Sequence, residues 1–409
     1  MKSKTNWYKS VNARIYRRCF GVVVIWRLLL EVLNQLQAHL YKQANTINSH
    51  SLGYLSRWAH WDGSWYLGIV ENGYKFLLYH SGSSANQNSI VFFPAFPFTT
   101  RYVADITRLN PILAGLIINF LMTSVACFFM YKITILVAEK YGGKLKIDQK
   151  YLGTIGMLCL LLYPAALFLA AFYVEAFLMV GITGSIYFAL KNRLWWAAAF
   201  MMIATASKSS GLVLLPTDAV IVFENWRLAK HRSYPELAKK LSVLVAGLAG
   251  LAAFMLYQLI RFGSALLWYR DQAAWRPPTK TFFLNNIYQI YYSHFFQESY
   301  YGGRYYYAMN IFLMLLPFLI MALGIWIVVK YKTYWPLVLG FFGLALPLVT
   351  GTLLSLNRIE IVTIPMASFI VLASTKKKAY KIALISILLI SSLILALLTL
   401  GFLRLKFAG

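Results

Sequence analysis

Runs of about 20 apolar residues recur along this sequence from Cys19 to Phe407, with no large polar region between them. A helix of that length spans the ~30 Å hydrocarbon layer of a membrane. The chain of 409 residues is 60% hydrophobic and only 13% charged, and a soluble domain of this size does not need so much apolar sequence to close its core. We therefore expect an all-α polytopic membrane protein that forms a single domain over residues 1–409.

The basic residues outnumber the acidic residues by 39 to 13, which gives a formal net charge of +26. They lie in short clusters at the ends of the apolar runs and not along one polar face, which argues against a nucleic-acid-binding surface. Lysine and arginine are enriched in the cytoplasmic loops of membrane proteins. We therefore expect a multi-pass protein of the cell membrane with a cytoplasmic N-terminus and six cytoplasmic basic clusters, at 2–18, 140–150, 191–193, 227–240, 330–332 and 376–381.

The six basic clusters and the apolar runs together predict about 11 transmembrane helices. An outer segment, 41–108, contains "SIVFFPAFPFTTRYVADI", whose prolines favour a re-entrant or interfacial element over a span. The stretch 194–223 is too short for two full spans, yet it lies between two basic clusters, so we expect two short or broken helices that meet at Lys208. A second outer segment, 263–308, is rich in tyrosine and tryptophan, and we expect it to cover a functional site carried by the first outer segment.

Carboxylates are scarce enough to be sorted one by one. Those in the basic loops (Glu139, Asp148, Glu224 and Glu236) most simply offset lysines, Glu31 has Arg27 one helical turn away, and Asp218 could cap or pair near the inner end. The acids that remain are expected on the outer side, namely Asp62, Glu71, Asp105, Glu175, Asp271, Glu298 and Glu360.

Asp62 stands out among these acids because it is flanked by aromatic residues in "HWDGSWYLGIVENGY". The rings of Trp61, Trp65 and Tyr66 could stack on a sugar, and low water content at a membrane boundary raises the basicity of a carboxylate. Asp62 is therefore a candidate general base. An aspartate that caps the following helix explains the residue equally well.

Glu175 is the second unusual acid, because it lies inside the apolar sequence "FYVEAFLMV". An ionisable group at membrane depth needs a cationic or hydrogen-bonding partner, or contacts a substrate. Arg358, Arg304, Lys208 and Arg101 are cations expected on the same outer half. Each alone could be an interfacial side chain that reaches toward water, but with an acid they describe a pocket for an anionic lipid head group.

Several of these motifs resemble those of the PIG-V family, the second mannosyltransferase of GPI-anchor assembly and its prokaryotic relatives. The resemblance starts with "HWDGSWYLGIVENGY" and "SIVFFPAFPF". It continues through "LLYPAALFLAAFYVEAFLMV", "ASKSSGLVLLP" and "FGSALLWYRDQAAW", so it covers about residues 58–275 in the family's order. Lys208 and Ser210 replace the family's arginine and asparagine, Val174 replaces a serine, and "LNRI" around Arg358 is only loosely similar to its proline–arginine–tyrosine motif.

The resemblance implies a GT-C glycosyltransferase fold with about 11 transmembrane helices and helices in the outer loops. It implies a hexose, mannose first, moved with inversion from a polyprenyl-phosphate donor to an acceptor hydroxyl on the non-cytoplasmic face. Asp62 would be the catalytic base, and Trp61, Trp65, Tyr66, Glu175, Lys208, Arg304 and Arg358 would bind substrate. We expect no obligatory metal, although Mg²⁺ could bind weakly.

Other functions would share some of these features. A transporter or flippase of lipid-linked sugars would have outer cations too, but also inverted repeats and charges near the midplane, and the sequence has no visible repeat. An ion channel would need a ring or filter pattern, for which nothing in the sequence argues. A non-catalytic subunit that supports another glycosyltransferase would keep all the motifs.

Overall fold

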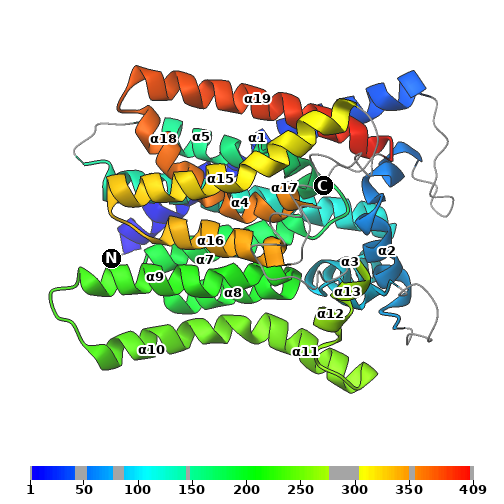
Figure 1. The fold of residues 1–409 in the computed structure, drawn as a ribbon, viewed down its shortest axis with the longest axis horizontal. Coiled ribbons are helices and arrows are strands. Elements are labelled where there is room, and N and C mark those ends of the chain that lie inside the picture. The colour runs from blue at the N-terminus through cyan, green and yellow to red at the C-terminus, as the bar shows by residue number, and fades with distance from the viewer. Residues whose placement is uncertain are drawn as a thin grey trace.

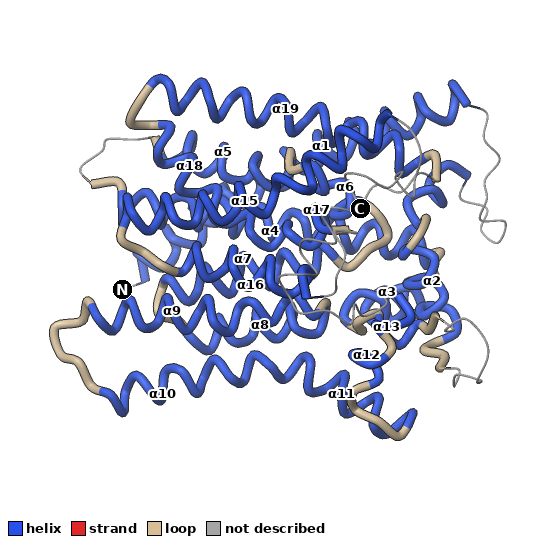
Figure 2. Tube along the Cα trace, viewed as in Figure 1, coloured by secondary structure: helices blue, strands red, loops and turns tan. Residues whose placement is uncertain are grey.

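The computed structural model describes residues 2–41, 53–76, 87–143, 148–275, 304–349 and 355–405. In this part of the chain all regular structure is helical, as Figures 1 and 2 show. Most helices run along the length of the molecule. They are α1 (Lys2–Tyr41), α4 (Pro111–Tyr141), α5 (Gln149–Leu161), α7 (Glu175–Leu190), α8 (Leu194–Ser207), α9 (Leu214–Arg227), α10 (Tyr234–Val245), α11 (Ala249–Phe262), α15 (Arg304–Tyr331), α16 (Trp335–Val349), α18 (Ala367–Ser374) and α19 (Lys378–Leu403).

Shorter helices connect them or cover one end of the bundle. They are the 3-10 helices η1 (Gly53–Ala59), η2 (Ser89–Val91), η3 (Pro164–Ala166), η4 (Ser209–Val213), η5 (Ala246–Leu248) and η6 (Glu360–Met366), and the α-helices α2 (Asp62–Asn72), α3 (Ala95–Thr107), α6 (Leu167–Ala170), α12 (Leu267–Arg270), α13 (Gln272–Trp275) and α17 (Leu356–Ile359). The elements α2, α3, α12 and α13 gather at the right-hand end in Figure 1.

The length and apolar composition of the helices are consistent with a multi-pass membrane protein. Within the described residues, five helices or continuous helical segments are long and apolar enough to cross a membrane, namely Val11–His39, Pro111–Tyr141, Tyr234–Phe262, Leu356–Ser374 and Lys378–Leu403. The pair Gln149–Leu161 and Pro164–Ala170, which is bent by 74°, makes a sixth if it is counted as one broken span. Shorter apolar helices accompany them, so the count of about 11 stays a prediction.

The irregular helices follow the sequence prediction. The stretch 194–223 forms α8 and α9, which are separated at Lys208 by the 3-10 helix η4. The proline-rich outer element forms α3, where Pro94 is at the N-cap and Pro97 is in the first turn. Prolines are tolerated there because the first backbone N–H groups of a helix have no partner within it.

Two acids that we assigned to the inner end have more specific partners than predicted. Glu224 is buried and does not simply offset loop lysines: its carboxylate accepts hydrogen bonds from the Thr333 hydroxyl (2.7 Å) and the Tyr334 amide (2.5 Å), just before α16. Asp218 is buried within α9 and accepts a hydrogen bond from the Ser185 hydroxyl of α7 at 2.5 Å. Glu224 therefore connects α9 to the segment that precedes α16, and Asp218 connects α9 to α7.

The two ends of the bundle differ in charge. At the left-hand end in Figure 1, α4, α7, α9, α15 and α18 end, and α1, α5, α8, α10, α16 and α19 begin. The described members of the six basic clusters flank these helix ends, so they gather at one end of the molecule. The elements that carry the outer motifs, α2 and α3, lie at the opposite end. This arrangement agrees with the predicted sorting of charge, and its orientation in a membrane stays a prediction.

Candidate functional site

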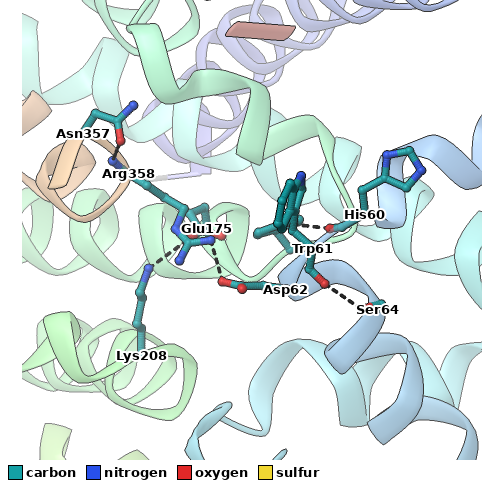
Figure 3. A network of polar contacts seen from close by, with 9 residues as sticks. His60, Trp61, Asp62, Ser64, Glu175, Lys208, Asn357 and Arg358 are labelled. Carbon is teal, nitrogen blue, oxygen red and sulfur yellow. Dashed lines mark hydrogen bonds and ion pairs between the residues drawn. The ribbon is translucent and has the colours of Figure 1, made fainter. Parts of the chain in front are cut away.

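Four charged side chains from four separate segments meet at the end of the bundle opposite the basic clusters (Figure 3). Arg358 Nη1 lies 2.6 Å from Asp62 Oδ2, and Arg358 Nε lies 3.5 Å from Glu175 Oε1. Lys208 Nζ lies 2.9 Å from the same Glu175 oxygen. We call Asp62, Arg358, Glu175 and Lys208 the charged network. Its signs alternate along the series, so each acid has a cation beside it.

Glu175 is the buried centre of the charged network. It is the first residue of α7, where the partial positive charge of a helix N-terminus favours a carboxylate, and its side chain is only 1% exposed. A buried carboxylate is tolerated when cations and hydrogen bonds compensate for the water it loses. Of the two roles that the sequence left open for Glu175, the structure shows pairing with Lys208, and its contact with a substrate is untested.

Arg358 is held in place by both polar and aromatic contacts. The Asn357 side chain accepts a hydrogen bond from the Arg358 amide at 2.8 Å, and the Tyr163 hydroxyl donates to the Asn357 carbonyl at 2.8 Å. The guanidinium carbon lies 5.3 Å from the ring centre of Phe168 and 5.5 Å from that of Tyr173. These rings stabilise the cation and restrict its movement.

Asp62 begins helix α2 after a sharp turn. Trp61 has a positive φ of 57°, and the Gly63 amide donates to the His60 carbonyl at 3.0 Å. A Cβ on Gly63 would lie 3.3 Å from both the Phe172 carbonyl oxygen and the Tyr173 ring, so a glycine suits this close approach. Trp61 occupies the N-cap position, and the Asp62 carboxylate pairs with Arg358. The Asp62 side chain therefore pairs with Arg358 and does not occupy the N-cap position, and its role as a base stays a prediction.

The segments that carry Asp62 and Glu175 are bonded to each other. The Phe172 amide donates to the Trp58 carbonyl at 2.8 Å, and the Tyr173 hydroxyl donates to the His60 carbonyl at 3.0 Å. Asn119, within the apolar helix α4, donates to the carbonyls of Ala171 (2.6 Å) and Tyr173 (2.8 Å). These bonds fix the distance between the two acids.

Helix α1 supports the same region through the predicted Arg27–Glu31 ion pair, which the structure confirms. The Arg27 guanidinium also donates to the Ala170 carbonyl at 2.6 Å and lies over the Trp58 ring, 4.6 Å from its centre. Arg27 thus contacts the segment that precedes Asp62 and the segment that precedes Glu175, and it is not part of the charged network.

The aromatic residues predicted to bind substrate have different surroundings. Trp61 is 39% exposed next to Asp62. Trp65 is half-buried and packs edge-on against Trp275 of α13, with ring centres 5.0 Å apart. Tyr66 is buried, and the edges of Phe92 and Phe96 pack against it. Of the three, Trp61 therefore offers the most exposed surface to a ligand, and Tyr66 packs in the core.

Of the other predicted cations, Arg101 lies away from the charged network, and Arg304 cannot be placed relative to it. Arg101 lies on the exposed side of α3, 4.0 Å from Asp105. Arg304 is the first residue of α15, and its side chain lies outside the described residues. Residues 276–303 of the second outer segment also lie outside them, so its predicted position over the site stays a prediction.

The sequence prediction missed the residues that support the charged network, namely Asn119, Tyr163, Phe168, Tyr173 and Asn357. A signal was present for some of them. Asn119 is a polar residue in an otherwise apolar helix, which marks a helix contact. Tyr163, Phe168 and Tyr173 all lie in the block "LLYPAALFLAAFYVEAFLMV", which also contains Glu175.

In the described part of the chain, no three histidine, cysteine, aspartate or glutamate side chains converge in a metal-binding arrangement. Each of the two site acids faces a cation instead. Weak binding of Mg²⁺ by Asp62 and a substrate phosphate stays a prediction.

Comparison with known proteins gives one informative similarity. No protein-family model matches the chain. Over 161 residues the sequence is 27% identical to human GPI alpha-1,6-mannosyltransferase 2, and the aligned segment covers 39% of this chain and 31% of the human protein. This distant similarity supports a PIG-V-like mannosyltransferase family at most. At a coarse level it suggests a membrane-embedded glycosyltransferase.

Proposed function

We propose that this protein is a membrane glycosyltransferase that moves a hexose, with mannose the first candidate, from a polyprenyl-phosphate donor to an acceptor hydroxyl. The proposal is supported by the similarity to a mannosyltransferase together with the charged network. The single observation that carries it is the Asp62–Arg358 contact of 2.6 Å, because it puts a partly exposed carboxylate beside a guanidinium, the type of cation that suits a phosphate. The Asp62 side chain is 27% exposed, whereas Glu175 is 1% exposed.

In the proposed reaction Asp62 accepts the proton of the acceptor hydroxyl. The hydroxyl oxygen then forms a bond to the anomeric carbon as the bond from that carbon to the phosphate oxygen breaks. The leaving lipid phosphate keeps the electron pair, and attack from the opposite side inverts the configuration. Trp61, which is exposed beside Asp62, offers a ring face for the sugar.

Arg358 has a double role in this proposal, because the same guanidinium would contact Asp62 before the donor binds and the donor phosphate afterwards. The donor phosphate competes with Asp62 for Arg358, so donor binding frees the carboxylate to contact the acceptor hydroxyl. Arg358 then stabilises the negative charge that develops on the leaving phosphate. Lys208 stays paired with Glu175, and the Glu175 carboxylate continues to face Arg358 from the other side.

The proposed setting is the non-cytoplasmic face of the cell membrane, with the donor lipid in the outer leaflet. The outer segments 41–108 and 263–308 would surround the site. The acceptor would be a glycan, a lipid or a protein, and a partner subunit would be compatible with the same chemistry.

The proposal is tested by sugar transfer with the purified protein, a polyprenyl-phosphate mannose donor and a panel of acceptors. Removal of a general base costs at least ~100-fold in rate, so Asp62→Asn should lower transfer by that factor. The matched control is Glu236→Gln, which makes the same carboxylate-to-amide change at the exposed start of α10, beside Lys240. Transfer by Asp62→Asn at the parent rate would contradict the proposal.

A further inference from the structure

A group of lysines lies over aromatic rings at the end of the bundle opposite the charged network. Lys330 Nζ lies 4.5 Å from the ring centre of Trp326, 5.4 Å from that of Tyr331 and 4.8 Å from that of Tyr380. Lys376 Nζ lies 5.6 Å from Tyr331, and Lys377 Nζ lies 5.9 Å from Tyr380. We call these residues (Trp326, Lys330, Tyr331, Lys376, Lys377 and Tyr380) the lysine–aromatic cluster.

The lysine–aromatic cluster is assembled from elements that are distant in sequence. Trp326, Lys330 and Tyr331 belong to the last turns of α15, the two other lysines follow α18, and Tyr380 is in the first turn of α19. In Figure 1 the end of α15 and the connection between α18 and α19 lie at the same end of the molecule. The lysine–aromatic cluster therefore forms only when α15 packs near the connection between α18 and α19, and the basic loop alone does not make it.

The charges of the lysine–aromatic cluster are not balanced by the described protein. Lys330 and Lys376 share the Tyr331 ring, and Lys330 and Lys377 share the Tyr380 ring, so three like charges lie close together. Within the described residues, no carboxylate forms an ion pair with any of the three lysines. Ring faces offset part of the repulsion. An anion placed between the ammonium groups would offset the rest.

Exposed apolar side chains lie close in sequence to the lysine–aromatic cluster, on the same two helices. On α15, Ile325 is 52% exposed and Val329 is 64% exposed, and on α19, Ile382 is 55% exposed and Ile385 is 46% exposed. Free phosphate would leave these side chains uncovered. A phospholipid would put its phosphate among the lysines and its acyl chains along the isoleucines and valine.

We propose that the lysine–aromatic cluster is a binding site for the phosphate of an anionic phospholipid of the bilayer. The rings fix the lysine stems, the ammonium groups contact the phosphate oxygens, and the adjacent apolar residues contact the first carbons of the acyl chains. This site is separate from the charged network and does not depend on the proposed transferase activity.

The test measures lipid binding to the full-length protein by native mass spectrometry after reconstitution in mixed phosphatidylglycerol and phosphatidylcholine. The test variant is the triple substitution Lys330→Gln, Lys376→Gln and Lys377→Gln. The control variant removes the same charge at the same end of the bundle, through Lys191→Gln, Lys230→Gln and Lys239→Gln, which affects none of the cluster's rings. All six lysines are exposed, so both variants should fold.

We expect the test variant to bind phosphatidylglycerol at least about 10-fold more weakly, and the control to stay within about twofold of the parent. Equal binding by the test and control variants would overturn the proposal, because binding would then reflect total charge alone. The parent protein supplies a second test: phosphatidylglycerol should displace bound lipid at concentrations where phosphatidylcholine and inorganic phosphate do not. Displacement by inorganic phosphate at equal concentration would also overturn the lipid assignment.

Discussion

Arg358 contacts both acids of the charged network with different nitrogen atoms. Its Nη1 pairs with Asp62 at 2.6 Å, and its Nε faces Glu175 at 3.5 Å. A planar guanidinium can hold two carboxylates in fixed positions, whereas a lysine ammonium is a single point charge on a flexible stem. The identity of this residue should therefore matter as well as its charge.

We predict that Arg358→Lys lowers sugar transfer by about 100-fold, because a positioned donor to the leaving phosphate is lost. The measurement is the transfer rate of purified variants in the assay used for Asp62. Arg101→Lys is the control, since Arg101 is exposed on α3 and makes only a 4.0 Å contact with Asp105. If Arg358→Lys transfers sugar as fast as the control, positive charge alone is sufficient at this position.

His60 makes the stability of the outer segment depend on pH. Burial, with a smaller contribution from the nearby Arg57 charge, lowers the pKa of His60 from 6.5 to about 4. The folded protein therefore keeps His60 neutral at pH values where the unfolded chain binds a proton. Stability is fully present above about pH 6.5 and is lost as pH falls from there toward about 4.

Between pH 7.5 and pH 5 this effect amounts to roughly 2 kcal/mol, from 1.36 kcal/mol for each pKa unit. We predict a lower melting temperature at pH 5 for the protein in detergent, and a smaller difference for His60→Gln. Variant and parent should be compared at both pH values. An identical pH dependence in the two proteins would exclude His60 as its source.

At the scale of elements, the break between α8 and α9 positions Lys208 for Glu175. Gly211 allows η4 to turn back against the end of α8: a Cβ at this position would lie 2.4 Å from the Ala204 carbonyl oxygen and 2.8 Å from the Thr205 amide nitrogen. The Gly211 amide also donates to the Lys208 carbonyl at 2.9 Å. A side chain at position 211 would push η4 away from the backbone at the end of α8. Backbone atoms cannot move aside as the end of a flexible side chain can.

We predict that Gly211→Ala destabilises the protein by about 1–3 kcal/mol, the usual range for an overpacked core, and reduces transfer by displacing Lys208. Thermal unfolding and the transfer rate provide the measurements. Gly68→Ala is the matched control, since no atom lies within 4 Å of a Cβ at that helical position. Equal melting temperatures for the two variants would show that η4 can move away without cost.

The same elements show how far prediction from the sequence reached. The break at Lys208 could be predicted because the distance between basic clusters leaves room for only two short helices. The partner of Glu175 could be narrowed to a few cations because an acid in an apolar helix needs one. The Asp62–Arg358 contact joins residues 296 positions apart. Helix packing decides such a contact, and it also decides that Tyr66 is buried. From the sequence alone, Tyr66 and its aromatic neighbours were equally consistent with sugar binding.

For the whole molecule, charge is sorted between the two ends of the bundle. The described basic clusters, including the lysine–aromatic cluster, lie at one end, whereas the charged network of two acids and two cations has no net formal charge at the other. A membrane potential and anionic lipids both favour the basic end on the cytoplasmic side. The charged network would then face a donor lipid in the outer leaflet.

We predict that Thr107→Cys, at the exposed end of α3, reacts with a membrane-impermeant maleimide in sealed right-side-out vesicles. Lys191→Cys, in the connection between α7 and α8, should react only after the vesicles are permeabilised. The native cysteines Cys19, Cys127 and Cys159 are all buried, so the parent protein should give little background. The reverse labelling pattern would place the charged network on the cytoplasmic side of the membrane, where a donor in the outer leaflet could not reach Asp62. In that case the charged network could still act on a lipid-linked sugar, but its donor would have to be presented from the inner leaflet.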